Sequence, residues 1–382
     1  MKKIICLYGN SVYYGHERSN VQVFNLLHAE GFDLLVVTNE KGVAPEAVQV
    51  FNDKGIKHES IAYPDWADMR KPFTVVRVLK YISKVIKHNF AFYKKLRQFK
   101  PDYIYIANDF MYLSLVPSFI LSNKKIVYRL GDAPLTGWKP FKILWKKYIV
   151  KRTHTFVCIS QFIKDKLTLA GRKPNDRDVV IYNYPPIRSS DKEVLLPLHV
   201  QNGITFGYLG QLIDIKGVGL FIDAAIALCK KYSDVYFILA GDLSYSKEYT
   251  QGLLNKVQEA DVQDRIIFLG SVENIKDFFS KTDVLVTPSV KEEPLGNVLV
   301  EAKSYYTPSI IFNSGGMPEL IKHKHNGYVR TESTAAALET AMQYYIDNAD
   351  LIEEHSKNAF ASVKELGIGF AEYREKWLDV FK

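Results

Sequence analysis

Cysteine is scarce in this sequence, and long apolar runs are missing from it. Only Cys6, Cys158 and Cys229 occur in 382 residues, without a Cys-x-x-Cys pair or a histidine at metal-binding spacing. Disulfide frameworks and zinc sites need paired, closely spaced ligands, so we expect reduced thiols, no metal site and a cytoplasmic location. No apolar run approaches the roughly 18 residues that span a membrane. The run at 3–8 ends at a Gly-Asn pair and predicts a buried strand, not a signal peptide.

Acidic residues are scarce in one half of the chain. The net charge of +8 combines +15 over residues 1–200 with −7 over residues 201–382. The two halves therefore face different electrostatic partners, and a phosphate site in the acidic half must rely on local dipoles and a few placed cations. A hydrophobic content of 47% with 24% charged residues excludes a disordered chain. No recognised nucleic-acid motif accompanies the basic charge, so nucleic acid is not an expected partner.

Short apolar runs alternate with longer amphipathic stretches, which is the pattern of βα units and parallel sheets. A Pro-Pro pair and a polar stretch indicate a linker at 185–201. We therefore expect an α/β protein of two doubly wound, Rossmann-like domains facing across a cleft, with ligands outside the carboxyl ends of the strands. Strands are predicted near 3–8, 33–38, 103–107, 125–129, 155–159, 179–182, 204–209, 235–240, 266–269, 284–287 and 309–312, and first-half helices at 18–30, 43–54, 74–98, 111–121, 140–150 and 161–169.

The strongest local feature is the segment from Thr287 to Glu301. A buried strand ends at Thr287, a loop with two acids follows, and a helix begins near Leu295. A helix N-terminus offers backbone N–H groups to a diphosphate, and Gly296 permits close approach. Glu301 lies on an otherwise apolar helix face, where two sugar hydroxyls would satisfy its carboxylate. Taken alone, the Glu-x7-Glu spacing between Glu293 and Glu301 is equally consistent with a solvated loop acid and a backbone-bonded carboxylate.

Further motifs occur in a definite order in the second half. Phe206–Gly217 is a strand that enters a glycine turn followed by a lysine, and similar strand ends recur at Ile238–Asp242, Ile267–Val272 and Ser314–Leu320. In this order and spacing, residues 204–330 resemble the C-terminal domain of retaining glycosyltransferases of the GT-B fold, family 4 type. The resemblance implies that the second half binds a nucleotide-sugar donor.

The resemblance assigns expected roles to single residues. Lys216 matches the basic residue that meets the donor diphosphate, and Gln211 stands where a second one, usually arginine, occurs. Glu293 matches the acid near the donor sugar, and Glu301 matches the acid that holds the ribose hydroxyls. The turn at 271–272 matches the segment that binds the nucleobase. The implied catalytic residues are Glu293, Lys216 and Asp132, and the implied donor-binding residues are Gly15, Gln211, Lys216, Ser271, Val272, Glu293, Leu295, Gly296, Asn297, Val298 and Glu301.

The first half carries the resemblance in fewer residues. Tyr14-Gly15 follows the first strand where relatives have two glycines, and Gly15 is expected to approach the donor phosphate and the acceptor. Gly131 stands where many relatives have a histidine near the reacting carbon, which leaves Asp132. His16 is a geometric substitute for that histidine, and an incidental loop histidine is the alternative interpretation.

The resemblance also divides the chain. Residues 1–200 correspond to an acceptor-binding domain, 201–365 to the nucleotide-sugar domain, and 366–382 to a terminal helix that returns to the N-terminal domain. With the domains linked twice, we expect closure about the linker on donor binding.

The reaction is expected to need no metal and no other cofactor. No separated carboxylate pair marks a double-displacement nucleophile. Asp176 and Asp178 have the DxD spacing of metal-using transferases, but their polar surroundings predict a solvated loop. We expect retaining transfer in which attack comes from the face that the diphosphate leaves, with Lys216 and the helix N–H groups stabilising the leaving phosphate.

Basic residues of the first half gather on two amphipathic helices. Residues 70–100 hold ten Lys and Arg and no acid, and residues 138–152 interleave Lys and Arg with aromatics. Such helices bind anionic lipid surfaces. Each helix alone is better explained by a packed apolar stripe with a solvated basic face, whereas both together, with the charge of +15, favour peripheral contact at the inner face of the cell membrane.

We therefore expect a glycosyltransferase of the hexosyltransferase kind. It would move a sugar from a nucleotide-sugar, with UDP favoured as the commonest donor nucleotide of the family, to a lipid-linked or polysaccharide acceptor in cell-surface glycan assembly. The alternatives are a nucleotide-sugar epimerase or phosphorylase of the same fold, and a non-catalytic module that binds sugar nucleotides or lipid surfaces.

Overall fold

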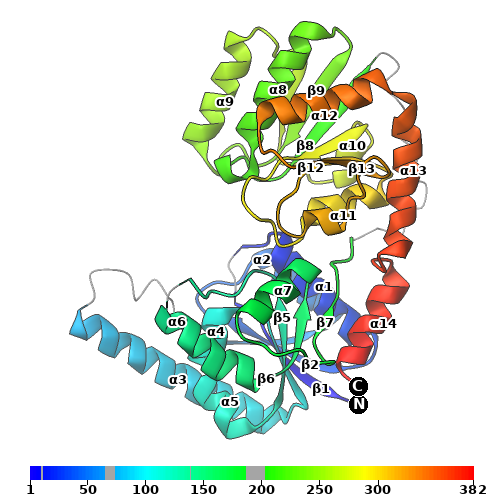
Figure 1. Ribbon diagram of the computed structural model, residues 1–382. Helices are drawn as coiled ribbons and strands as arrows, with labels where there is room; N and C mark the ends of the chain where they lie inside the picture. The colour runs from blue at the N-terminus through cyan, green and yellow to red at the C-terminus, as the bar shows by residue number, and fades with distance from the viewer. Residues whose placement is uncertain (10–11, 65–73, 138, 186–202) are drawn as a thin grey trace. The chain divides into compact units, whose positions relative to one another are not determined.

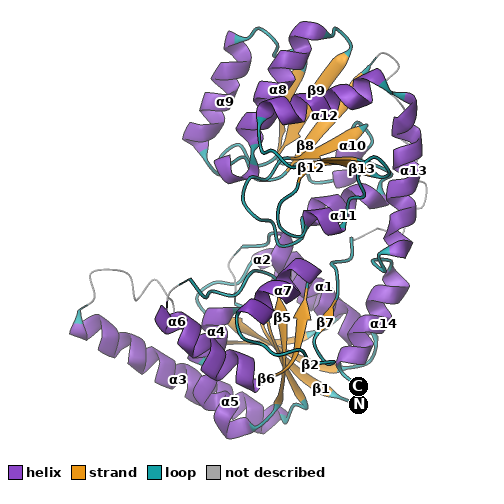
Figure 2. Cartoon of the chain, in the orientation of Figure 1, coloured by secondary structure: helices purple, strands orange, loops and turns teal. Residues whose placement is uncertain are grey.

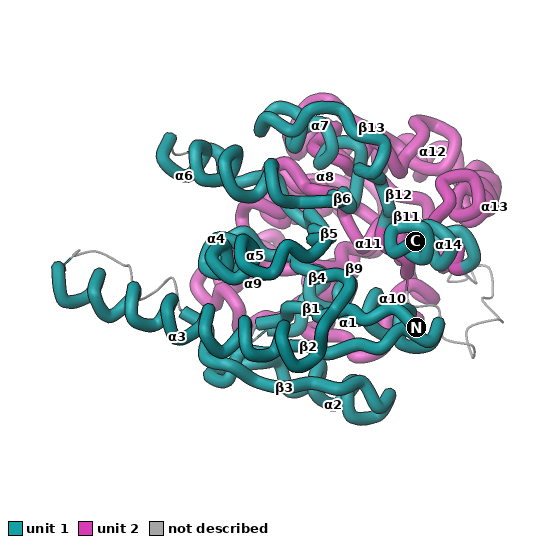
Figure 3. Tube along the Cα trace, turned by 90° about the horizontal axis from the view of Figure 1, so that it is seen from below, with its two compact units in different colours: residues 1–182, 371–382 teal, residues 183–370 magenta. Residues whose placement is uncertain are grey.

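The computed structural model describes the chain except for residues 10–11, 65–73, 138 and 186–202. The described residues form two compact units, shown in teal and magenta in Figure 3. Unit 1 contains residues 1–182 together with 371–382, and unit 2 contains residues 183–370. The domain boundary expected at residue 200 and most of the expected linker lie outside the described residues.

Unit 1 is built on a seven-stranded, entirely parallel sheet with the order β3-β2-β1-β4-β5-β6-β7. The central strands are almost continuously apolar, as expected for strands covered on both faces. The strand order reverses between β1 and β4, and ligands of such sheets bind at the carboxyl ends beside this switch point. The strands are β1 Lys3–Leu7, β2 Asp33–Asn39, β3 Lys57–Ile61, β4 Tyr103–Ile106, β5 Lys125–Leu130, β6 Thr153–Cys158 and β7 Val179–Val180.

Helices connect these strands, and several begin at a residue whose side chain accepts a hydrogen bond from the first turn. Thr74, Asn108 and Ser160 cap α3, α4 and α7 in this way. In the described parts of the chain, no helix combines the length and the apolar character needed to cross a membrane. The helices of unit 1 are α1 Gly15–Ala29, α2 Pro45–Lys54, α3 Val75–Phe99, α4 Asp109–Ser114, α5 Val116–Ser122, α6 Lys139–Leu144, the π-helix η2 Trp145–Val150, α7 Gln161–Leu169 and α14 Phe370–Val380 (Figures 1 and 2).

Unit 2 repeats the plan with a six-stranded parallel sheet of order β10-β9-β8-β11-β12-β13, whose switch point lies between β8 and β11. Helices α8 and α12 pack their apolar sides with the sheet residues into one core that includes Phe221, Phe237 and Leu338. The strands are β8 Ile204–Leu209, β9 Val235–Ala240, β10 Ile266–Gly270, β11 Val284–Thr287, β12 Ser309–Phe312 and β13 Gly327–Arg330. The helices are η4 Asp214–Lys216, α8 Val218–Lys231, α9 Lys247–Glu259, α10 Ile275–Phe279, α11 Asn297–Ser304, η5 Met317–Glu319, α12 Ala335–Asp347 and α13 Asp350–Glu365.

Most predicted elements are confirmed within a few residues, with instructive exceptions. The strands β3 and β13 were not predicted, because the first is polar at four of its five positions and the second, Gly-Tyr-Val-Arg, has only two apolar residues between a glycine and an arginine. The helix predicted at 111–121 is two helices, since Pro117 lies at the start of α5 and cannot donate a backbone hydrogen bond to the preceding turn. The helix predicted at 140–150 changes from α to π form at Trp145.

Except for its first residue, the terminal helix α14 belongs to unit 1, although it follows unit 2 in the sequence. Arg374 holds Glu30 through two hydrogen bonds of 2.6 and 2.5 Å. Trp377 and Phe381 are buried, and the Phe381 ring meets the Tyr103 ring edge-on with centroids 5.3 Å apart. Apolar burial and a bidentate ion pair therefore attach the last twelve residues to the first sheet.

The prediction of a solvated loop at 176–178 is wrong for Asp178. Its carboxylate is buried, accepts 2.6 and 3.0 Å hydrogen bonds from Arg172, and accepts a third bond from the backbone N–H of Phe156 at 2.9 Å. Asp176 is exposed as predicted. Asp178 therefore joins the end of α7 to the strand β6. Among the described residues, no group of three or more His, Cys, Asp and Glu side chains lies close enough to hold a metal ion.

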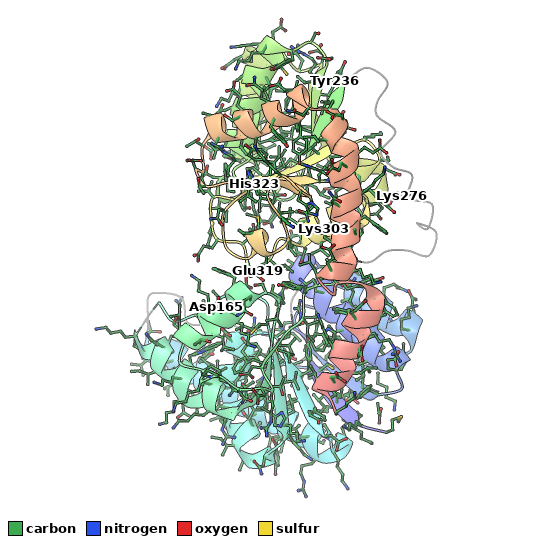
Figure 4. The ribbon with its side chains drawn as sticks, turned by 45° about the vertical axis from the view of Figure 1, so that its right-hand side comes forward. Asp165, Tyr236, Lys276, Lys303, Glu319 and His323 are labelled. Atoms are coloured by element: carbon green, nitrogen blue, oxygen red, sulfur yellow. The ribbon has the colours of Figure 1, made fainter. Side chains whose placement is uncertain are left out.

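A buried lysine lies in unit 2. Lys303 on α11 is fully buried and donates a 2.7 Å hydrogen bond to the hydroxyl of Ser362 on α13, which itself donates to the Ala359 carbonyl (Figure 4). Burial lowers the pKa of Lys303 to about 7, partly offset by the negative charge of Glu365. The charged form is therefore disfavoured in the folded state.

We expect Lys303→Met to raise the free energy of unfolding, by on the order of 2–4 kcal/mol at pH 6. The pKa of Lys303 is lower in the folded chain than in the unfolded one, so the cost of burying it is complete below about pH 7 and declines as the pH rises toward 10.5. Denaturant unfolding at pH 6 and pH 9.5 should show a smaller gain at the higher pH. Lys357→Met, at an exposed site on α13, is the control, and an equal gain at both pH values would contradict the account.

Candidate functional site

An ion pair joins two loops at the switch point of unit 2. Lys216 ends η4, just after β8, and its Nζ donates a hydrogen bond to Oε1 of Glu293 in the loop after β11. The hydroxyl of Ser289 donates to the same oxygen at 2.8 Å. Both charged side chains keep some exposure, 29% for Lys216 and 16% for Glu293. The structure thus unites two residues that the sequence singled out separately, at the sheet edge where α/β proteins bind ligands.

Backbone contacts hold these two loops against each other. The N–H of Val290 donates to the carbonyl of Ile215 at 3.1 Å. Gly217 has a φ of 70° and lies so close to the backbone of Pro288 that a β-carbon would overlap with it. Both the left-handed conformation and the close approach require glycine here. The position of Lys216 is therefore set by the strand β11 as well as by its own turn.

A second glycine contact supports Glu293 from the other side. Gly315, after β12, has a φ of 61°, and a β-carbon there would lie 2.6 Å from the backbone nitrogen of Glu293. The N–H of Gly316 donates to the Glu293 carbonyl at 2.7 Å. The loop that carries Glu293 is therefore held between the ends of β8 and β12 by its main chain, which leaves the carboxylate free to exchange partners.

The start of α11 presents backbone donors beside this carboxylate. Gly296, with a φ of 86°, precedes the first helical residue Asn297, and the N–H of Leu299 is already bonded to the Gly296 carbonyl. No acceptor among the described residues pairs with the backbone N–H groups of 295–298. An N-terminal turn with free donors attracts anions, so this turn and Lys216 together suit a diphosphate.

One further contact fixes the side chain of the first residue of α11. The amide of Asn183 donates to Oδ1 of Asn297 at 2.5 Å. Glu301 follows one turn later and is half-buried. Sequence reasoning missed Asn183, because nothing local distinguishes it and its partner lies 114 residues away.

Neighbouring strand ends complete the carboxyl edge of unit 2. The N–H of Gly241 donates to the Gly270 carbonyl at 2.9 Å, and a β-carbon on Gly241 would overlap with the Gly210 carbonyl. The backbones at the ends of β8, β9 and β10 therefore approach one another closely. Ser271 is exposed and Val272 half-buried immediately after β10, so the expected nucleobase turn lies at the same edge as Lys216.

Gln211 is fixed by its main chain and keeps a half-exposed side chain. Its carbonyl accepts a 2.7 Å hydrogen bond from the hydroxyl of Tyr208. Burial, followed by the negative charge of Glu293, raises the pKa of Tyr208. Tyr208 therefore remains a neutral donor that connects the Gln211 turn to the surroundings of Glu293.

Unit 1 carries the remaining predicted residues at its own switch point. Gly15 is the first residue of α1, after β1, and is exposed. Asp132 follows β5 and is also exposed. Both lie at the carboxyl edge of the sheet, as predicted. Gly15, Asp132 and His16 belong to unit 1, so the structure groups them with one another.

A buried carboxylic acid lies at the same edge and was not predicted. Asp109 begins α4 after β4, and the hydroxyl of Tyr128 donates to its Oδ1. Burial raises the pKa of Asp109 to about 7, with a further contribution from the charge of Asp132. The signal was present, because Asn108-Asp109 directly follows a buried strand.

Two family models match the chain and together cover most of it. Residues 13–184 match the model described as Glycosyltransferase Family 4, and residues 197–362 match the one described as Glycosyl transferases group 1. The two matches follow the division into an N-terminal and a C-terminal half.

Individual relatives agree with these matches. An uncharacterized glycosyltransferase of Haemophilus influenzae is 23% identical over 363 residues, which cover 93% of each chain. The lipopolysaccharide core biosynthesis mannosyltransferase LpcC of Rhizobium leguminosarum is 30% identical over 159 residues, 41% of this chain and 45% of that one. Among solved structures, Anabaena Alr3699/HepE in complex with UDP and glucose has a TM-score of 0.78 at 20% identity and covers 100% of this chain and 99% of its own. This last likeness shows the fold.

We expect Gly315→Ala to destabilise unit 2 by about 2–4 kcal/mol, because its β-carbon would overlap with the Glu293 backbone at a left-handed position. Gly252→Ala is the matched control. Gly252 lies inside α9 with open space around it, so alanine there should be neutral or stabilise by up to about 1 kcal/mol. Denaturant unfolding of both variants checks this, and equal effects would refute the close approach at Gly315.

Proposed function

The chain is a glycosyltransferase of the family 4 type with the GT-B fold, and from this premise we propose that it transfers a sugar from a UDP-sugar to a glycan or glycolipid acceptor. The transfer retains the configuration of the anomeric carbon and needs no metal ion. Its products belong to cell-surface glycans.

The observation that carries the proposal is the placement of Lys216 and Glu293 beside the free N–H groups of α11. Negative charge develops on the β-phosphate as the sugar–phosphate bond breaks. A cation and oriented N–H donors stabilise that charge most when they are already in position. In the resting protein Lys216 is bonded to Glu293, and on donor binding we infer that Lys216 turns to the diphosphate while Glu293 binds the sugar.

The rest of the carboxyl edge fits the remainder of a UDP-sugar. Glu301 would accept hydrogen bonds from the two ribose hydroxyls, and the turn at 271–272 would hold the base. Support for UDP comes from Anabaena HepE, a structural neighbour whose structure contains UDP and glucose. Support for a surface-glycan acceptor comes from the name of the Rhizobium relative.

Release of free nucleotide from a panel of UDP-, GDP- and ADP-sugars tests the proposal. We expect release from a UDP-sugar that EDTA does not reduce, and Lys216→Ala should lower its rate by roughly 10²–10³-fold because a pre-positioned charge is lost. Lys281→Ala is the control, since Lys281 is exposed and precedes β11 at the opposite end of that strand. Near-normal turnover by Lys216→Ala would overturn the role of Lys216, and release from GDP- or ADP-sugars alone would overturn the donor assignment.

The predicted membrane contact gains support from α3. From its start to Phe90 the helix presents an apolar face whose six members are between 47% and 76% exposed, and its buried residues, His88, Phe92 and Leu96, lie toward its C-terminal end. That end of α3 extends beyond the body of unit 1 (Figures 1 and 3). The α3 apolar face consists of Val75, Val76, Leu79, Ile82, Ile86 and Phe90.

The charge on α3 favours an anionic lipid surface as the partner. Arg77, Lys80, Lys84 and Lys87 lie among the apolar residues, and the helix contains no acid. Apolar burial and attraction to anionic headgroups act together on such a helix. The second predicted segment, 138–152, contributes less than expected, because Phe141 and Trp145 are buried in unit 1 and residue 138 lies outside the described residues, as do residues 70–73 of the first segment.

Ile86→Glu should reduce binding to phosphatidylserine-containing vesicles by at least about tenfold, since it places a like charge on the inserted face. Leu169→Glu, at a single 77% exposed leucine on α7, should bind as the wild type does. Sedimentation with anionic and with phosphatidylcholine vesicles measures this, and binding should weaken as salt is added. Unchanged binding by Ile86→Glu, or self-association of the chain through this face instead, would contradict the lipid surface.

A further inference from the structure

The imidazole of His16 occupies the space that a side chain at position 131 would need. A β-carbon built on Gly131 would lie 2.6 Å from Cε1 of His16 and would also overlap with Nδ1. His16 lies in the first turn of α1, after β1, whereas Gly131 follows β5. The ring therefore reaches across the switch point between β1 and β4 to the strand beyond it.

Space, not backbone conformation, is what requires glycine at position 131. Nine described glycines have a positive φ, and Gly131 is not one of them. Any other L-residue could adopt its backbone conformation, but its β-carbon would displace the His16 ring. The lack of a side chain at position 131 is therefore what leaves room for the His16 imidazole.

The first turn of α1 is held in place from three directions. The side-chain amide of Asn20 donates to the His16 carbonyl at 2.9 Å, and Oδ1 of Asn20 accepts from Tyr105 at 2.7 Å and from Arg129 at 3.3 Å. The His16 ring itself donates to the backbone carbonyl of Ala107, after β4. The imidazole is therefore bonded to the segment after β4, and Asn20 ties the turn that carries it to β4 and β5.

The His16 ring is uncharged at neutral pH. Burial, with the positive charge of Arg129 as a second cause, lowers its pKa to about 4. A neutral imidazole that donates one N–H to a carbonyl keeps a lone pair on its other nitrogen. Such a group accepts a hydrogen bond from a hydroxyl and does not attract the diphosphate.

We propose that His16 is a substrate-binding residue of unit 1, whose imidazole, seated over Gly131, accepts a hydrogen bond from a sugar hydroxyl. The inference rests on the proposed function, since a sugar hydroxyl is the ligand. It deepens that function by assigning the polar contact of unit 1 to a residue of α1 and by explaining why position 131 is glycine.

A double-mutant cycle on thermal stability tests the arrangement without any substrate. Gly131→Ala should lower the melting temperature in the wild-type background and have little effect in the His16→Ala background, where the ring is gone. Equal effects in both backgrounds would overturn the seating of the ring over Gly131. His28→Ala, at the other end of α1, is the control background. In it, Gly131→Ala should lower the melting temperature as much as it does in the wild type.

A reciprocal exchange tests the role. His16→Ala should lower UDP release from the UDP-sugar used by the wild type by at least tenfold, and the double variant His16→Ala/Gly131→His should restore it, because its imidazole enters the same space from β5. His28→Ala should retain full activity. Full activity of His16→Ala, or no recovery in the double variant, would overturn the proposal.

Ligand-induced shifts in melting temperature show whether the hydroxyl that His16 binds belongs to the donor or to the acceptor. They also distinguish failure of this proposal from failure of the proposed function. If the hydroxyl belongs to the donor, His16→Ala should remove the extra stabilisation that the UDP-sugar gives over UDP alone. If it belongs to the acceptor, that difference persists while kcat/KM for transfer falls. Failure of the proposed function would appear instead as a wild-type chain that UDP does not stabilise, whatever the stability cycle at 16 and 131 shows.

Discussion

The ion pair between Lys216 and Glu293 is the interaction on which the candidate site of unit 2 depends. It joins residues 77 positions apart at the one place where the strand order reverses. A parallel sheet brings the carboxyl ends of its strands to a common edge, so a cation after β8 and an acid after β11 must meet there. Because the pair remains partly exposed, it can rearrange around a ligand without burying an unpaired charge.

The close approach of neighbouring backbones fixes the positions of Lys216 and Glu293. Gly217 and Gly315 both have left-handed φ values and both lie where a β-carbon would strike the main chain of the neighbouring loop. Gly131 in unit 1 differs, because its neighbour is a side chain and its own φ is ordinary. Glycine thus serves two purposes in this fold: it locks loops together in unit 2 and makes room for the His16 imidazole in unit 1.

Exposed apolar area on α3 is the feature that the fold itself does not explain. Six large apolar residues on one helix remain in water, whereas α14 is drawn back to unit 1 to bury Trp377 and Phe381. Covering the α3 apolar face would remove apolar area from water and so add stability. This exposed face, with basic residues beside it, is the observation on which the proposed contact with an anionic surface rests.

Much of this protein could be derived from its sequence, because strand ends, glycine turns and helix starts are local patterns. The βα alternation predicted two doubly wound domains, and the segment from Thr287 to Glu301 with Lys216 predicted a diphosphate site, whose residues the structure places together at the carboxyl edge of the second sheet. Short or polar strands such as β3 were missed, since periodicity is weak over five residues. Three contacts were decided only by the tertiary structure. Arg172 pairs with the buried Asp178, Asn183 donates a hydrogen bond to Asn297, and His16 fills the space over Gly131. These contacts join segments that lie far apart in the chain. They depend on the order and register of the strands, and no local sequence pattern encodes that order or register.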